Sequence, residues 1–147
     1  KALTHVRYAA SNEEYRAIFR GVQLEFSPQG FRAVASDGYR LALYDLPLPQ
    51  GFQAKAVVPA RSVDEMVRVL KGADGAEADL ALGEGVLALA LEGGSGVRMA
   101  LRLMEGEFPD YQRVIPQEFA LRVQVEGEAL REAVGRVRFI GLDGLGV

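Results

Sequence analysis

The sequence predicts an α+β domain that contains two similar units, each with one helix and three antiparallel strands. Glycine makes up 17 of the 147 residues, and this excess over the usual share indicates many tight turns between short strands. The same order of helix and strands occurs twice, about sixty residues apart, which is typical of an internal repeat. A hydrophobic content of 49% allows the chain to bury a sizeable core.

The first unit begins with apolar residues at helical spacing, which predict a helix over residues 2–10. Alternation of Val22, Leu24 and Phe26 with polar residues then predicts a strand, because side chains on a strand point to opposite faces in turn. Turn residues follow at 27–30 and 37–38. The three strands expected in this unit are residues 19–26, 31–36 and 40–46.

The second unit begins with a short apolar strand over residues 54–58, followed by a helix that starts at Pro59. Val63, Met66, Val67 and Leu70 recur at helical spacing and predict an amphipathic helix that ends at Lys71 and Gly72. Three more strands are expected at residues 79–82, 86–91 and 97–104. We expect both helices on one face of a continuous sheet.

A third unit starts near the end of the chain, with a strand expected over residues 119–125 and a helix over residues 128–137. This pattern predicts one domain over residues 1–116 and the truncated start of another over residues 117–147. The chain begins with Lys1 rather than Met, and we expect it to be a fragment.

The composition argues against most enzyme classes. The chain has no cysteine and one histidine, His5, so disulfides, cysteine zinc sites, paired-histidine metal sites and histidine-based triads are not expected. Asp37, Glu107 and Asp110 lie in turn sequences that already explain them, and no glycine run resembles a phosphate-binding loop. We therefore predict a non-enzyme without cofactor or metal. No membrane span or signal peptide is expected either.

Three stretches of sequence are more specific than the periodicity. They are Val34–Ala42, which reads VASDGYRLA, Val57–Ser62, which reads VVPARS, and Glu107–Pro116, which reads EFPDYQRVIP. Together they resemble the middle domain of the bacterial DNA polymerase III beta subunit, the sliding clamp. The resemblance runs from the first helix to about Val137.

This resemblance implies a DNA polymerase processivity factor with the sliding-clamp fold. It implies a homodimeric cytoplasmic ring, with sheets outside and helices lining a hole around duplex DNA, that tethers the replicative polymerase. DNA polymerase III alpha and clamp-loader subunits would bind through short peptide motifs. Residues 1–116 would form the middle domain without its first strand, and residues 117–147 would open the last domain.

The resemblance also implies a partner-peptide pocket. Apolar side chains suit Leu or Phe anchors, and arginines suit a carbonyl or an acid. Spacing alone favours a plain hairpin turn at Asp37–Gly38 and a linker kink at Pro109, whereas the two long motif matches favour the pocket. Tyr39 stands where many relatives have histidine. The pocket residues expected in this chain are Phe19, Ser36, Gly38, Tyr39, Arg40, Leu41, Pro109, Arg113 and Val114.

A basic face toward DNA is the second expected site, because a sliding clamp needs weak, sequence-independent attraction to phosphates. The net charge of −3 argues against binding over the whole surface but allows such a face. The alternative is a solvated helix face with pairs such as Asp64–Arg68. The candidate cations are Lys1, Arg7, Arg16, Arg61, Arg68 and Lys71.

Two other functions stay open at this point. One is a self-associating β-rich scaffold with no role on DNA. The other is a small-molecule-binding α+β domain, which the sequence disfavours because polar residues do not converge on one site.

Overall fold

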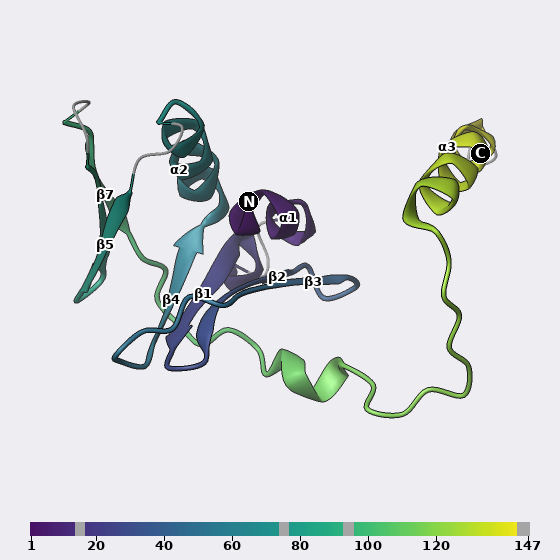
Figure 1. Ribbon diagram of the computed structural model, residues 1–147, viewed down its shortest axis with the longest axis horizontal. Helices are drawn as coiled ribbons and strands as arrows, with labels where there is room; N and C mark the ends of the chain where they lie inside the picture. Colours follow the sequence, from purple (N-terminus) through teal and green to yellow (C-terminus); the bar gives the residue numbers. More distant parts are fainter. Residues whose placement is uncertain (14–16, 74–76, 93–95, 144–147) are drawn as a thin grey trace. The chain divides into compact units, whose positions relative to one another are not determined.

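The computed structural model describes residues 1–13, 17–73, 77–92 and 96–143 of the chain (Figure 1). The chain divides into two compact units, Lys1–Tyr111 and Gln112–Val147. The division falls five residues before the domain boundary expected from the sequence. Arg16, one of the candidate DNA-facing cations, lies outside the described residues. Among the helices that are described, none is both long enough and apolar enough to cross a bilayer.

The first unit is organised around a four-stranded antiparallel sheet in the order β3-β2-β1-β4. Register pairs join Leu24 of β1 to Ala33 of β2 and to Ala56 of β4, so β1 is hydrogen-bonded on both edges. The four strands are β1 (Gly21–Ser27), β2 (Gly30–Ser36), β3 (Leu41–Leu46) and β4 (Ala54–Pro59).

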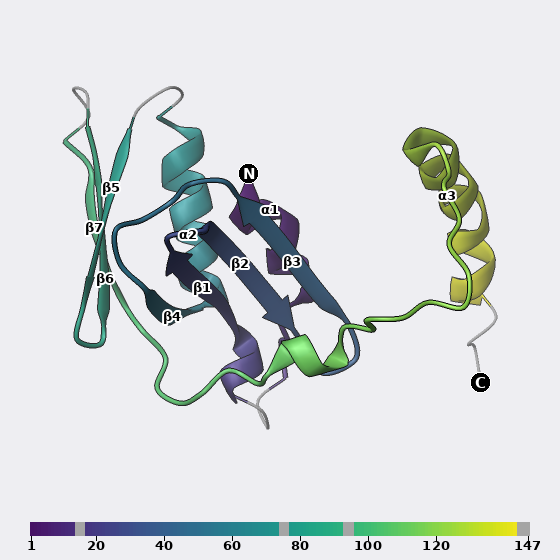
Figure 2. The same ribbon diagram turned by 60° about the horizontal axis from the view of Figure 1, so that its bottom comes forward.

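Two helices cover one face of this sheet, as Figures 1 and 2 both show. They are α1 (Ala2–Val6), which continues into a 3-10 turn η1 (Arg7–Ala9), and α2 (Ala60–Lys71). Alternate strand residues point toward the helices and form the main core together with apolar residues of the helices. The core includes Val22, Leu24, Phe31 and Val58 from the strands and Val63 and Met66 from α2. The α+β class and the two helices predicted from the sequence are confirmed.

A second antiparallel sheet of three strands packs its apolar side chains into the same core. Its strands are β5 (Ala78–Gly83), β6 (Val86–Leu91) and β7 (Arg98–Arg102). The prediction of one continuous sheet is wrong. Beyond β7 the chain donates a backbone hydrogen bond from Met104 N to the Val57 carbonyl, 2.8 Å away, but no strand ladder joins β7 to β4 among the described residues.

The start of the first expected strand is also wrong. Phe19 lies in a 3-10 turn, η2 (Ala17–Arg20), and β1 begins two residues later at Gly21. The ladder between β1 and β4 begins with the pair Gly21 and Pro59, so Phe19 has no strand partner among the described residues. At Gly21 itself, a Cβ would approach Val57 Cγ1 at 2.4 Å and Met104 Sδ at 2.6 Å. The close approach of these side chains requires glycine at this position.

The second unit contains the 17-residue helix α3 (Gly127–Asp143), where the sequence predicts a helix. Glu126 caps its first turn, since its carboxylate accepts hydrogen bonds from Glu128 N at 3.0 Å and Ala129 N at 2.7 Å. These backbone N–H donors, that of Glu128 first, lower the pKa of Glu126. The 3-10 turn η3 (Tyr111–Val114) joins the two units in sequence.

The strand expected over residues 119–125 is absent, which corrects that prediction. Phe119, Leu121, Val123 and Val125 alternate as a strand would, but their side chains are exposed. An alternating segment becomes a strand only when a neighbouring strand pairs with it, and no described strand pairs with this one.

The helix α2 provides a test of the core. Met66 is 2% exposed, whereas Leu70 is only partly buried against the same core. We expect Met66→Ala to lower the free energy of unfolding by about 2–5 kcal/mol, and Leu70→Ala by about 1–2 kcal/mol. Urea unfolding of the two variants measures both values. An equal or larger loss for Leu70→Ala would contradict the packing described here.

Candidate functional site

The face of the four-stranded sheet that points away from the helices carries two of the expected pocket residues, Ser36 and Leu41. Register pairs place its side chains in rows across the strands. One row is charged and consists of Lys55, Glu25, Arg32 and Asp45. The next row consists of Val57, Gln23, Val34 and Leu43. Ser36 and Leu41 form a directly opposed pair beyond it. We call this surface the outer face.

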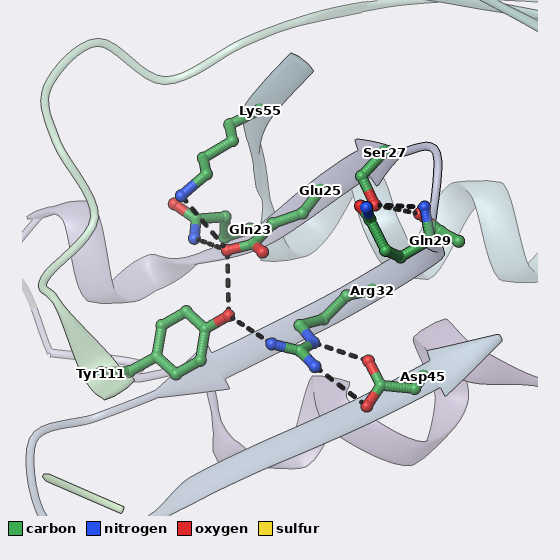
Figure 3. Close-up of polar contacts among 9 residues, drawn as sticks. Gln23, Glu25, Ser27, Gln29, Arg32, Asp45, Lys55 and Tyr111 are labelled. Atoms are coloured by element: carbon green, nitrogen blue, oxygen red, sulfur yellow. Dashed lines mark hydrogen bonds and ion pairs between the residues drawn. The ribbon is translucent and has the colours of Figure 1, made fainter. Parts of the chain in front are cut away.

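The charged row alternates in sign across the four strands (Figure 3). Arg32 holds Asp45 with two hydrogen bonds, Nε to Oδ1 at 2.6 Å and Nη2 to Oδ2 at 3.1 Å. Lys55 Nζ lies 3.8 Å from Glu25 Oε1. The hydrogen bond to Asp45, and then the one to Tyr111, raises the pKa of Arg32. The guanidinium therefore stays charged at every accessible pH.

Tyr111 lies over this row and is 5% exposed. Its hydroxyl donates to Glu25 Oε1 at 3.0 Å and accepts from Arg32 Nη1 at 3.3 Å. Gln23 Nε2 donates to the same Glu25 oxygen at 2.6 Å, which gives a buried amide its partner. Burial raises the pKa of the Tyr111 hydroxyl, the hydrogen bond from Arg32 opposes this, and the nearby Glu25 charge adds to it.

A small apolar cluster lies beside the charged row. Phe19, Val34 and Val57 are buried, although none of them belongs to the main core between the helices and the sheets. The Phe19 ring meets the Phe108 ring edge-on, with centroids 6.3 Å apart. The segment after β7, which includes Met104 and Phe108, runs on the side of the sheet away from α1 and α2 (Figure 1). It covers this cluster from outside.

The hairpin turn between β2 and β3 presents Leu41 at the end of the outer face. Asp37 Oδ1 accepts from Tyr39 N at 2.9 Å and Arg40 N at 3.0 Å, and Ser36 Oγ donates to the Arg40 carbonyl at 2.8 Å. The backbone N–H of Arg40, followed by that of Tyr39, lowers the pKa of Asp37. Gly38 has φ +94°, a conformation that favours glycine. Turn chemistry therefore explains Asp37 and Gly38 in full.

Two expected pocket residues at this turn point outward. Tyr39 is 93% exposed. Arg40 Nε pairs with Asp37 Oδ2 at 2.9 Å, and its guanidinium lies 5.9 Å from the centre of the Tyr8 ring. Arg40 is thus already held by two groups of its own chain.

The linker residues of the expected pocket divide between the units. Pro109 is exposed and lies between Phe108 and Tyr111 in the first unit. Arg113 and Val114 belong to the second unit, where both side chains are exposed.

Sequence reasoning missed four residues that organise the outer face, namely Glu25, Arg32, Phe108 and Tyr111. The alternation in β1 and β2 places Glu25 and Arg32 opposite the core residues, so their common face could have been found from the sequence. Their contact with a tyrosine 79 residues beyond Arg32 could not, since no periodic signal connects residues so far apart.

The candidate DNA-facing cations differ in their surroundings. Arg7 is partly buried. Its Nε donates to the Ala60 carbonyl at 3.1 Å, and its Nη2 donates to Asp64 Oδ2 at 2.9 Å. The suggested Asp64–Arg68 pair is therefore wrong, since Asp64 pairs with Arg7 and Arg68 pairs with Glu65. Lys1, Arg61 and Lys71 are exposed at α1 and α2.

No group of three or more histidine, aspartate or glutamate side chains in the described part of the chain could hold a metal ion.

The tyrosine hydroxyl predicts a pH dependence of stability. Because folding raises the pKa of Tyr111 above its ordinary value of 10.0, the unfolded chain releases this proton first as the pH rises. The contribution of the hydroxyl is then complete below about pH 10 and declines above it. We expect the stability advantage of the wild-type chain over Tyr111→Phe to shrink between about pH 9 and about pH 11.

Urea unfolding of both chains across this range measures the effect. The two chains differ only in this hydroxyl, so effects of pH that both chains share largely cancel in the difference. A difference that stays constant or grows above about pH 10 would contradict this account.

Comparisons with known proteins show which family this chain resembles in sequence. Residues 1–110 match the family model described as DNA polymerase III beta subunit, central domain. The beta sliding clamp of Caulobacter vibrioides is 31% identical over 149 residues, a match that covers 97% of this chain and 39% of that protein. The beta sliding clamp of Escherichia coli K12 is 27% identical and matches 91% of this chain and 36% of its own length.

Solved structures show the same fold. The DNA polymerase III beta subunit of Thermotoga maritima superposes with a TM-score of 0.84 at 30% identity, covering 94% of this chain and 37% of that one. The DNA polymerase sliding clamp of Bacillus subtilis also gives a TM-score of 0.84, at 25% identity, with 94% and 36% covered. The chain thus spans less than two-fifths of the length of these relatives. Since the family match extends from α1 to the residue before Tyr111, this chain belongs to the DNA polymerase III beta subunit family and carries its central domain.

Proposed function

We propose that this chain is part of a sliding clamp, a non-enzymatic processivity factor that tethers the replicative DNA polymerase to duplex DNA. The family match over residues 1–110 carries the proposal. The complete protein would be a homodimeric ring in the cytoplasm. Its partners would be duplex DNA, which it encircles, and DNA polymerase III alpha and clamp-loader subunits, which bind through short peptides.

We propose that the partner peptide binds at the Leu41 end of the outer face. Leu41 is partly exposed, and the buried apolar cluster of Phe19, Val34 and Val57 lies on the same face. A peptide with adjacent apolar anchors gains free energy by covering the exposed part of Leu41. Pro109 is exposed on the segment that crosses this face, and Arg113 and Val114 follow it in the chain.

The domain assignment is also a proposal, in which residues 1–116 form a middle domain that lacks one strand and residues 117–147 open the last domain. The internal repeat supports it. In the first sheet β1 is paired with β2 and β4, whereas β5, its equivalent in the second sheet, pairs only with β6 among the described strands. A groove of about 800 Å³ borders the free edge of β5 and is lined by residues that include Leu3, Phe26, Met66, Leu70 and Leu80.

A peptide titration tests the partner site. We expect a short synthetic peptide with an adjacent Leu-Phe pair to shift the amide resonances of Phe19, Gly38 and Leu41 together, with an affinity of about millimolar. Leu41→Glu should abolish these shifts, because the introduced charge would be buried without a partner.

Leu48→Glu is the matched control, because Leu48 is exposed and borders the groove near β5 rather than the outer face. This variant should bind the peptide like the wild-type chain. Shifts scattered over the surface, or equal losses in both variants, would contradict the proposed site and favour a scaffold without partner recognition.

The salt dependence of DNA binding tests the proposed basic face. Each phosphate contact adds about 0.9 to the slope of log affinity against log salt concentration, so the Arg61→Gln/Lys71→Gln pair should reduce the slope by up to about 2. Fluorescence anisotropy with a duplex oligonucleotide measures the slope.

Arg98→Gln/Arg102→Gln removes the same charge from exposed positions on β7 and should leave the slope largely unchanged. Equal effects of the two pairs would show that net charge, not the helix face, attracts DNA. Tight binding that does not respond to salt would contradict the clamp proposal itself, because a ring holds DNA by topology and needs only weak contacts.

A further inference from the structure

Three contacts described by the structure attach the segment that crosses the outer face, between β7 and the end of the first unit. Its Met104 N–H donates to the Val57 carbonyl at 2.8 Å. The Phe108 ring lies edge-on to Phe19. Tyr111 provides the third attachment, through its hydroxyl. Pro109 lies between the second and third attachments.

These attachments differ in what they require from the sheet. The Met104 bond uses only backbone atoms, and the Phe108 contact is apolar. The Tyr111 hydroxyl, in contrast, must find an acceptor and a donor at one spot, and it finds both in the charged row, where Glu25 and Arg32 are directly opposed register partners. The geometry of this attachment is set by directional hydrogen bonds between side chains.

The groups around the hydroxyl are themselves held in place. Arg32 is fixed by its two hydrogen bonds to Asp45, and Glu25 is fixed by Gln23 and by Lys55. The donor and the acceptor therefore cannot follow the tyrosine if the segment moves. A group held in this way restricts the segment to one position along the strands, which an apolar contact alone does not do.

We propose that Tyr111 is a positioning residue for the partner-peptide site. Its hydroxyl locks the segment 104–111 onto the outer face, which keeps Phe108 on Phe19 and holds Pro109 beside the apolar cluster. This inference rests on the proposed function, since it assigns to Tyr111 the shape of one border of the peptide site. The Tyr111 side chain is buried against the strands, with its hydroxyl on Glu25 and Arg32. Its role is therefore to position the segment and not to contact the peptide.

The test compares Tyr111→Phe with the wild-type chain by two measurements. The variant keeps the buried ring and loses only the hydroxyl. Amide hydrogen exchange should become about 3- to 10-fold faster at Met104, whose N–H is hydrogen-bonded to the Val57 carbonyl, and stay unchanged in β1 and β2, as expected for the loss of one local hydrogen-bonded attachment. Affinity for the Leu-Phe peptide, followed at Leu41, should weaken by a similar factor.

Two further variants separate the attachment from general effects. Tyr44→Phe is the matched control, because Tyr44 is half-buried on the opposite face of the same sheet, with its ring 5.0 Å from that of His5. It should change neither measurement. Glu25→Gln keeps an acceptor oxygen for the hydroxyl and should fall between Tyr111→Phe and the wild-type chain in both.

The outcomes separate the two proposals. Unchanged exchange at the Met104 amide in Tyr111→Phe would refute the attachment, whatever the peptide does. Faster exchange with an unaltered peptide affinity would refute the positioning role and leave the peptide site in place. Failure of the wild-type chain to bind the peptide would instead refute the proposed function, and with it the role of Tyr111 there.

Discussion

The two-residue period of the central strand β1 is the constraint on which the rest of the structure depends. Because β1 is paired on both edges, it cannot shift in register without breaking two ladders at once. Its register places Leu24 among core residues and Glu25 between Arg32 and Lys55. One strand therefore determines both the apolar face that receives the helices and the polar face that receives the segment after β7.

The polar face obtains its order from partial burial rather than from the number of its charges. Exposed ion pairs, such as those along α2 and α3, contribute little to stability. The charged row differs, because Tyr111 and the segment after β7 shield part of it from water and because Arg32 makes three directed hydrogen bonds. Removing one side chain of this row would leave a neighbouring buried donor or acceptor without its hydrogen bond, and this lowers the free energy of unfolding. Such a row favours one arrangement of the segment over its alternatives.

Hydrogen bonds from a single arginine side chain also join the two helices. Arg7, at the end of α1, binds both the first carbonyl of α2 and the carboxylate of Asp64 one turn later. A cation that satisfies a backbone acceptor and a side chain in this way is a structural element of the first unit. Lys1, Arg61 and Lys71 are exposed, as the proposed weak, salt-dependent attraction to DNA phosphates would require.

The sequence by itself determined the helices, the strands of the first unit and the family, because local periodicity and the stretch from Val34 to Ala42 are properties of neighbouring residues. Tertiary structure decided the rest. Residues 119–125 alternate like a strand but have no described partner to pair with, and Phe19 lies in a 3-10 turn because the ladder between β1 and β4 begins only at Gly21 and Pro59. The attachment of Tyr111 to Glu25 and Arg32 joins residues about eighty positions apart, and such contacts arise only when the folded chain brings them together.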